Sequence, residues 1–503
     1  MIGRIGVRSS HGHLFCLLLL VAAPTLGEAP TSGTEDLPRL LGSILGPSPL
    51  EENLRQLTDE IGGRVSGSTS NQRAVAWAVD AFQQAGVDSV ETETFELPVS
   101  WSEGATRIEV LEPQPIDVRG VSIAWSPPTP EGGIQASMID VGSGTAEEFD
   151  RHSGRLEGAL LLVDRAVLRS WDDLFAEYAD APPVIERAVA AGAAGILWIS
   201  TKQYGVLYRH INTPGTIDAL PQVILAREDG QRLSRLAATG TPIQMRLELP
   251  NRVGGPFEVA NVVAEIRGSD KAQEIVALGA HLDSWDLGSG ALDNGANVAL
   301  VIEVARAIRA AGIQPRRTLR FLLWNGEEQG LRGSADYARR HRDELEHFVA
   351  YLNIDGGIGP VRGFAVAGRP EIETVVREVL QPLANWGVTE HLLDTYGGSD
   401  HVDFLLEGVP ILDANQPEAN YLQNYHASSD TMDKVPMREL KLNTAIMAAT
   451  MLGIAQREKR LGKRLDRAGV EALIEETGFD AYLKSEGIWE DFQAGRRGRI
   501  PTP

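Results

Sequence analysis

A repeated order of apolar strand, polar loop and apolar helix constrains the fold of this 503-residue chain more than any other feature. The run from Glu274 to Ala280 has the length and apolar character of a buried strand. After a glycine-rich loop, the segment from Val298 to Ala311 has the periodicity of a helix. Because strands and helices continue to alternate up to about Gln456, we expect an α/β fold with a mostly parallel sheet and helices on both faces.

The predicted elements of this region can be placed individually. The strands are Ala260–Ile266, Ile275–Gly279, Leu319–Trp324, Ala350–Ile354 and Pro410–Leu412. The helices are Val298–Ala311, Ser334–Arg340, Ile372–Leu383 and Met437–Arg457. Upstream, the helices Leu50–Ile61 and Gln72–Ala85 and a strand near Val90–Phe95 indicate the start of the same domain.

The stretch from about Glu103 to Pro250 has a different texture. Short β-rich runs are separated by turns, with one clear helix from Val184 to Ala191, which predicts an inserted mixed β domain. After Lys463 we expect one helix, Arg467–Glu476, and then a disordered basic end. The predicted division is therefore residues 1–30, 31–102, 103–250, 251–460 and 461–503.

The N-terminal segment has the pattern of a secretory signal. Arg4 and Arg8 precede the apolar run Leu14–Ala23, and small residues follow near Gly27. Spanning a bilayer takes roughly 20 apolar residues, so we expect a cleaved signal peptide over residues 1–30 rather than an anchor. The protein would then be secreted or periplasmic, with no membrane attachment after cleavage. The single cysteine, Cys16, lies in this segment, which leaves the mature chain without a disulfide or a thiol nucleophile.

Charge excludes two classes of partner. The formal net charge is -22, and a surface this acidic would repel nucleic acids and anionic membranes. We therefore expect no nucleic-acid partner.

Side chains of metal-ligand type recur where the predicted strands end. Because the carboxyl ends of the strands in an open α/β sheet meet at one rim, these side chains should lie together. A catalytic zinc takes about three protein ligands and one open position, so five ligands suit two ions that share a bridging carboxylate. The candidates are His281, Asp293, Glu328, Asp355 and His426. We expect Asp293 to be the bridge because it lies on the flexible loop.

Two further carboxylates have predicted roles beside these ligands. In a strand, His281 and Asp283 point the same way, so Asp283 can accept the second ring N–H of His281. In an extended segment, the adjacent Glu327 and Glu328 point to different sides, so Glu328 can bind metal while Glu327 acts as the general acid and base. Tyr425, beside His426, would either donate a hydrogen bond to an oxyanion or pack against the loop.

A serine hydrolase is the wrong class for this chain. Ser399-Asp400-His401 contains the residue types of a triad, but sequence neighbours rarely have triad geometry and the chain has no G-x-S-x-G elbow. We expect His401 to be structural or part of a pocket wall, and Asp400 to be a helix N-terminal group.

The ordered ligand set resembles that of peptidase family M28, the co-catalytic zinc aminopeptidases and carboxypeptidases, and His281-Leu-Asp-Ser-Trp-Asp286 resembles its carboxypeptidase Q (plasma glutamate carboxypeptidase) branch. The resemblance implies that Asp293 bridges two zinc ions and that Glu327 is the general base. It also implies that His281 and Asp355 bind one ion, and that Glu328 and His426 bind the other. Asn294 departs from the pattern, because many relatives carry a second Asp there, and its missing charge could change the electrostatics around the bridge.

The same resemblance implies that the inserted domain is protease-associated-like and that the protein could form a homodimer. Together these observations predict an exported dizinc exopeptidase that hydrolyses short peptides or dipeptides as a carboxypeptidase, dipeptidase or aminopeptidase. Water bridging the metals would lose a proton to Glu327. The alternatives are a single-zinc glutaminyl cyclase-type transferase and a non-catalytic receptor or binding protein on the same scaffold.

Overall fold

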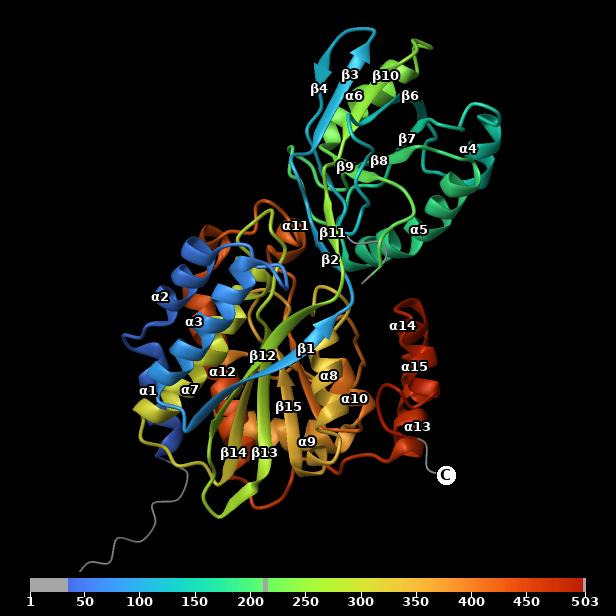
Figure 1. The fold of residues 1–503 in the computed structure, drawn as a ribbon. Coiled ribbons are helices and arrows are strands. Elements are labelled where there is room, and N and C mark those ends of the chain that lie inside the picture. Colours follow the sequence, from blue (N-terminus) through green and yellow to red (C-terminus); the bar gives the residue numbers. More distant parts are fainter. Residues whose placement is uncertain (1–34, 211–215, 501–503) are drawn as a thin grey trace, which may run out of the picture.

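The computed structural model describes residues 35–210 and 216–500. The predicted signal peptide and Cys16 lie outside the described residues. The described residues form a main domain built on one sheet and a smaller unit built on another (Figure 1).

The main domain is organised around a seven-stranded sheet. In spatial order, its strands are β1 (Ser89–Leu97), β12 (Phe257–Ile266), β14 (Arg317–Trp324), β13 (Lys271–His281), β15 (Phe348–Asn353), β17 (Ile411–Asn415) and β16 (Gly363–Ala365). The central strands β14, β13, β15 and β17 pair in parallel, whereas β1, β12 and β16 pair antiparallel at the edges. The predicted α/β fold is confirmed, with its parallel pairing confined to the centre of the sheet.

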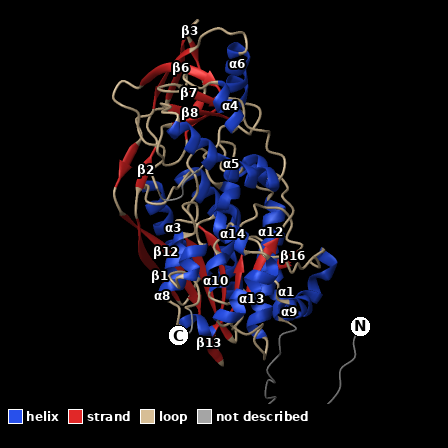
Figure 2. Ribbon diagram, turned by 90° about the vertical axis from the view of Figure 1, so that its right-hand side faces the viewer, coloured by secondary structure: helices blue, strands red, loops and turns tan. Residues whose placement is uncertain are grey.

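Helices cover both faces of this sheet. Val276, Leu278 and Ala280 of β13 face one apolar core, while Ile275 and Ala277 face the other, as expected when neighbouring side chains alternate. Over the first face lie α1 (Asp36–Leu45), α2 (Leu50–Arg55), α3 (Thr69–Ala85), α7 (Ala296–Ala310), α9 (Pro370–Leu380) and α12 (Met437–Gln456). Over the second lie α8 (Arg332–Arg340), α10 (His401–Leu406), α13 (Arg467–Thr477), α14 (Asp480–Ser485) and α15 (Trp489–Gln493), most of them visible in Figure 2.

The second sheet and its helices lie within residues 107–248, and we call the described residues of this range the inserted unit. Its strands, in spatial order, are β4 (Ile116–Asp117), β3 (Arg107–Glu112), β10 (Gln244–Glu248), β6 (Ile134–Asp140), β7 (Leu160–Val163), β8 (Gly195–Ile199), β9 (Gln222–Leu225) and β5 (Gly120–Ser122). Its helices are α4 (Ala146–Arg151), α5 (Trp171–Ala190) and α6 (Arg227–Ala237). A ribbon of β2 (Ser100–Ser102) and β11 (Arg252–Gly254) joins the unit to the main domain (Figure 1).

The structure corrects several predictions about local structure, among them the single helix expected after Lys463, because α14 and α15 follow α13. Helix α5 begins well before Val184 and contains Pro182 and Pro183, which normally end a helix and so hid its first half from sequence reasoning. The basic end after α13 is folded up to Ile500, because Arg497 pairs with the buried carboxylate of Asp403 at 2.7 Å.

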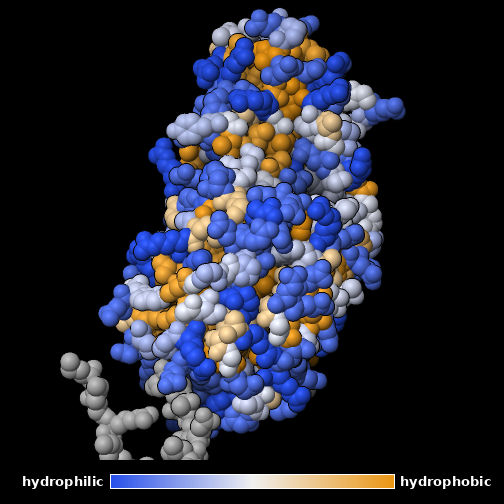
Figure 3. All heavy atoms as spheres, turned by 90° about the vertical axis from the view of Figure 1, so that its left-hand side faces the viewer, coloured by the Kyte–Doolittle hydropathy of each residue, from blue (hydrophilic) through white to orange (hydrophobic). Residues whose placement is uncertain are grey.

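Surface properties agree with the composition. Hydrophilic residues cover most of the face shown in Figure 3, with hydrophobic patches between them, one of which lies over the inserted unit. Within the described ranges, none of the helices combines the length and the apolar character needed to cross a membrane.

Candidate metal centre

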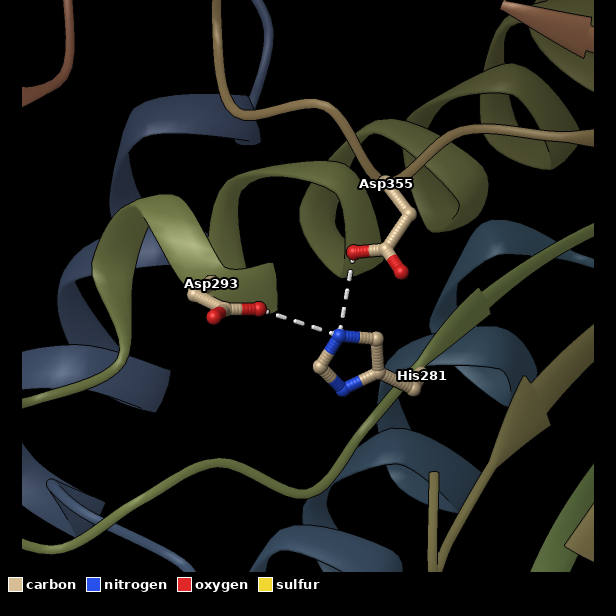
Figure 4. A group of neighbouring side chains, drawn as sticks. All are labelled: His281, Asp293 and Asp355. Carbon is tan, nitrogen blue, oxygen red and sulfur yellow. Dashed lines mark hydrogen bonds and ion pairs between the residues drawn. The ribbon is translucent and has the colours of Figure 1, made fainter. Parts of the chain in front are cut away.

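The first cluster of ligand-type side chains, the His281 group, lies at the rim of the main sheet. His281 is the last residue of β13, and its Nε2 lies 3.1 Å from Asp293 Oδ1 and 3.1 Å from Asp355 Oδ1 (Figure 4). Asp355 follows the end of β15, and Asp293 lies in the irregular turn Ala291–Gly295 that precedes α7. Adjacent parallel strands therefore bring two of these residues together, as the sequence predicts, and a loop brings the third.

The second cluster, the His426 group, shares Asp293 with the first. His426 Nε2 lies 2.9 Å from Glu328 Oε2 and 3.4 Å from Asp293 Oδ2. Glu328 lies in the turn after β14, and His426 follows the short helix α11 (Tyr421–Asn424). Asp293 thus directs one carboxylate oxygen to each group, so all five predicted ligand residues form one continuous cluster.

The electrostatics of the cluster suit divalent cations. Burial, reinforced by the charge of Asp293, raises the pKa of Glu328 well above its usual range. Burial also lowers the pKa of His426 to about 4, which keeps its imidazole neutral and able to bind a metal at pH 7. Three buried atoms of the cluster have no hydrogen-bond partner among the described residues: Asp293 Oδ2, Glu328 Oε1 and His426 Nδ1. Packed carboxylates of this kind are costly without a cation, and the mixed nitrogen and oxygen donors suit zinc.

Asp283 supports His281 in a different way from the prediction. His281 Nδ1 lies 3.0 Å from the backbone carbonyl oxygen of Asp283, whereas the nearer carboxylate oxygen is 3.6 Å away. The other carboxylate oxygen accepts hydrogen bonds from Ser66 Oγ at 2.9 Å and from the N–H of Gly326 at 3.0 Å. The main chain therefore orients the imidazole, and the carboxylate ties the end of β13 to the turn that carries Glu327 and Glu328.

Glu327 lies in a tight turn, so the predicted extended geometry for Glu327-Glu328 is wrong. The carbonyl oxygen of Glu327 accepts hydrogen bonds from the N–H groups of Gly330 and Leu331 at 2.8 and 3.0 Å. The side chain is half-buried. Burial, helped by the nearby charge of Asp355 and opposed by that of His281, raises the pKa of Glu327 well above its usual range. A raised pKa makes a carboxylate a stronger base, which suits a general base.

Sequence reasoning missed two buried residues that hold the loop between His281 and Asp293. The guanidinium of Arg64 donates to the carbonyl oxygens of Leu282, Ser289 and Gly290 at 2.6 to 2.8 Å. The carboxylate of Asp430 accepts from the N–H groups of Ala291, Leu292 and Asp293 at 2.7 to 3.2 Å. Neither residue has a sequence signal, because its partners lie more than a hundred positions away.

Four other residues discussed in the sequence analysis lie in structural surroundings. Asn294 is buried, donates from Nδ2 to the carbonyl oxygen of Ile354 at 3.1 Å, and accepts from Asn297 at 2.6 Å. Ser399 Oγ and His401 Nδ1 both face Asn353 of β15, at 3.1 and 3.4 Å, rather than each other. Asp400 precedes α10 but makes no side-chain cap hydrogen bond.

Comparison with known proteins finds similarity to peptidases. Residues 261–451 match the model of peptidase family M28. The chain is 27% identical to carboxypeptidase Q of Homo sapiens over 414 residues, which cover 82% of this chain and 86% of that protein. It is 26% identical to leucine aminopeptidase 2 of Trichophyton rubrum, covering 76% and 78% of the two chains.

Solved structures agree with this result. A peptidase M28 precursor from Shewanella amazonensis superposes with a TM-score of 0.76 at 28% identity, covering 85% of this chain and 98% of its own. A zinc aminopeptidase from Bacillus subtilis has the same fold, with a TM-score of 0.65 at 20% identity, covering 83% of this chain and 97% of its own.

Proposed function

From the premise that this chain carries a peptidase family M28 domain and is a metallo-exopeptidase, we propose that it is an exported dizinc enzyme that hydrolyses short peptides or dipeptides. The observation that carries this proposal is Asp293, whose two carboxylate oxygens face the two ligand groups separately. A carboxylate in that position is what two metals about 3.5–4 Å apart require.

The roles of the five ligand residues follow from their grouping. His281 and Asp355 would hold one zinc ion, Glu328 and His426 would hold the other, and Asp293 would bridge them. Asp283 and the main chain around it would keep the imidazole of His281 in the tautomer that presents Nε2 to the metal.

The chemistry divides between the ions and Glu327. When bound, zinc supplies Lewis acidity toward the scissile carbonyl and lowers the pKa of water. Glu327 takes the proton from the attacking water and returns it to the leaving amine. Because the proton stays on one carboxyl group, the second transfer needs no other acid.

Replacing Glu327 by Gln tests this assignment. The variant should keep two zinc ions per chain by elemental analysis, because Glu327 is not a ligand, while peptide hydrolysis falls by orders of magnitude. Glu328→Gln is the matched comparison, and it should lose zinc as well as activity. Undiminished hydrolysis by Glu327→Gln would exclude the general-base role, and one zinc per wild-type chain would favour the glutaminyl cyclase-type alternative.

The proposal also covers the substrate terminus that the enzyme recognises, the localisation of the protein and its oligomeric state. Assays with free dipeptides, N-blocked peptides and C-blocked peptides should separate carboxypeptidase, dipeptidase and aminopeptidase activity. A mature N-terminus near residue 30 in protein recovered from outside the cytoplasm would support export. Light scattering would distinguish a homodimer from a monomer. No hydrolysis of any of these substrates by the zinc-loaded protein would favour a binding protein.

A further inference from the structure

The loop that carries His426 is held by the inserted unit. Tyr208 forms an antiparallel bridge with Ala427. On either side of this bridge, the N–H of Arg209 donates to the carbonyl oxygen of His426 at 2.8 Å, and the N–H of Ser428 donates to the carbonyl oxygen of Leu207 at 2.8 Å. The main chain of a candidate metal ligand is therefore hydrogen-bonded directly to the inserted unit.

Side chains of the inserted unit extend this contact to the residues before His426. The ammonium of Lys202, which is 6% exposed, donates to the carbonyl oxygen of Leu422 at 2.8 Å. The Tyr178 hydroxyl lies 3.4 Å from that of Tyr425, and the ring of Tyr425 stacks on the imidazole of His426 with centroids 3.6 Å apart. Tyr425 therefore packs against His426, and this aromatic stack limits the rotation of the imidazole.

Arg209 also binds the loop between His281 and Asp293. Its guanidinium, 1% exposed, lies 2.8 Å from Asp286 Oδ1 on that loop and 2.8 Å from Glu103 Oε2 in the connection to the inserted unit. It also donates to the carbonyl oxygen of Ser122 in β5 at 2.6 Å. The guanidinium of Arg209 is buried, whereas the side chain of Asp286 is 39% exposed. A buried charge that loses a partner is destabilising, so this side chain holds the inserted unit against the loop of Asp286, while the N–H of Arg209 bonds the loop of His426.

We propose that the inserted unit is a positioning element of the metal centre. It fixes His426 and so determines how tightly the His426 group holds its zinc ion. The inference rests on the proposed two-zinc function. The His281 group depends less on the inserted unit, because His281 ends β13 and Asp355 follows β15 in the main domain. The inserted unit reaches this group through Arg209 and the side chain of Asp286, without a main-chain hydrogen bond to His281 or Asp355 among those that join the described residues. Arg209 and Lys202 act as positioning residues, since neither is a ligand.

Zinc retention by Arg209→Met and Lys202→Met tests the proposal. Arg119→Met is the matched control, because Arg119 pairs with Asp229 within the inserted unit and is 59% exposed. After dialysis against a graded chelator, the wild type and Arg119→Met should keep two ions at the same chelator strength. Arg209→Met and Lys202→Met should each release one ion to a chelator about 10–100-fold weaker than the wild type requires, which is the usual loss of metal affinity when a residue that supports a ligand is replaced. The other ion should be retained as in the wild type.

Amide hydrogen exchange on the zinc-loaded wild type provides a second measurement that needs no variant. The N–H groups of Arg209 and Ser428 should be protected, because both are bonded across the two units. Equal zinc retention in all four proteins, or exchange of these two amides as fast as in an open loop, would overturn the proposal. Fewer than two ions in the wild type, with the two amides still protected, would instead count against the dizinc function.

Discussion

The His281 group and the His426 group are built by different means, although they share Asp293. In the first group, the adjacent parallel strands β13 and β15 pair through their backbones, and this pairing positions His281 at the end of β13 and Asp355 just after β15. The second depends on a turn and on a loop that is bonded to the inserted unit. The rim of a sheet thus brings the residues of one group together directly, whereas the other group requires contacts between segments that are far apart in the sequence.

The largest expected effect comes from removing what the two groups share. Asp293→Asn withdraws a charged ligand from both, so both zinc ions should be lost and hydrolysis should fall about a thousandfold or more. Elemental analysis and kcat/KM would measure this, with the exposed Asp270→Asn as a control that should behave as wild type. Retention of one tightly bound ion would show that the groups are independent and that Asp293 is not a bridge.

A smaller effect is expected where the two loops are tied together. Asp430→Asn replaces one carboxylate oxygen by an NH₂ group, which must face either the N–H of Asp293 or the N–H groups of Ala291 and Leu292, so zinc affinity should fall about 10–100-fold. Asp433→Asn, on the same loop and 68% exposed, should leave affinity unchanged. If the two variants bind zinc equally well, the contact between the loops does not support either group.

The third prediction concerns the His281 group alone. In Asn294→Asp, a carboxylate oxygen would face the carbonyl oxygen of Ile354, next to Asp355, and the free energy of unfolding should fall by about 1–3 kcal/mol. Asn294→Ala loses the same hydrogen bond without adding charge, so it should be the milder change in chemical denaturation. An Asp variant as stable as wild type would show that the site accepts the second carboxylate found in many relatives.

The smallest expected effect separates global stability from the metal groups. His341 lies between Glu344 and Glu93, at 3.1 and 2.9 Å, and these hydrogen bonds raise its pKa to about 9. Its unfolded pKa is about 6.5, so the stabilisation is fully present below that pH and is lost as pH rises through 9. His341→Asn should lower Tm by a few degrees at pH 6 and less at pH 10, with zinc content unchanged. An equal shift at both pH values would exclude the charge of His341 as the cause.

The residues that the sequence placed well are those whose position is set by local structure. His281 ends an apolar strand and Asp355 closely follows one, so the strand end determines which rim of the sheet each residue faces. The glycine-rich sequence around Glu327 is compatible with an extended segment or with a tight turn. The hydrogen bonds from the N–H groups of Gly330 and Leu331 to the carbonyl oxygen of Glu327 form the turn.

The residues that escaped prediction act across long stretches of chain. Asp430 reaches Leu292 over 138 positions, and Arg209 reaches Asp286 over 77. A charged side chain in a polar loop has no local mark that it will be buried. Such residues could be found only from the three-dimensional structure.

Arg64 gives the metal centre a consequence for biosynthesis. Its guanidinium bonds the loop before Asp293 from 218 to 226 positions upstream, while His426 arrives late from the ribosome. Loop closure over such separations is slow and comes late in folding. A metal site that includes both His281 and His426 would therefore be completed only after His426 has been synthesised, and metal retention would report that segments far apart in the sequence have come together.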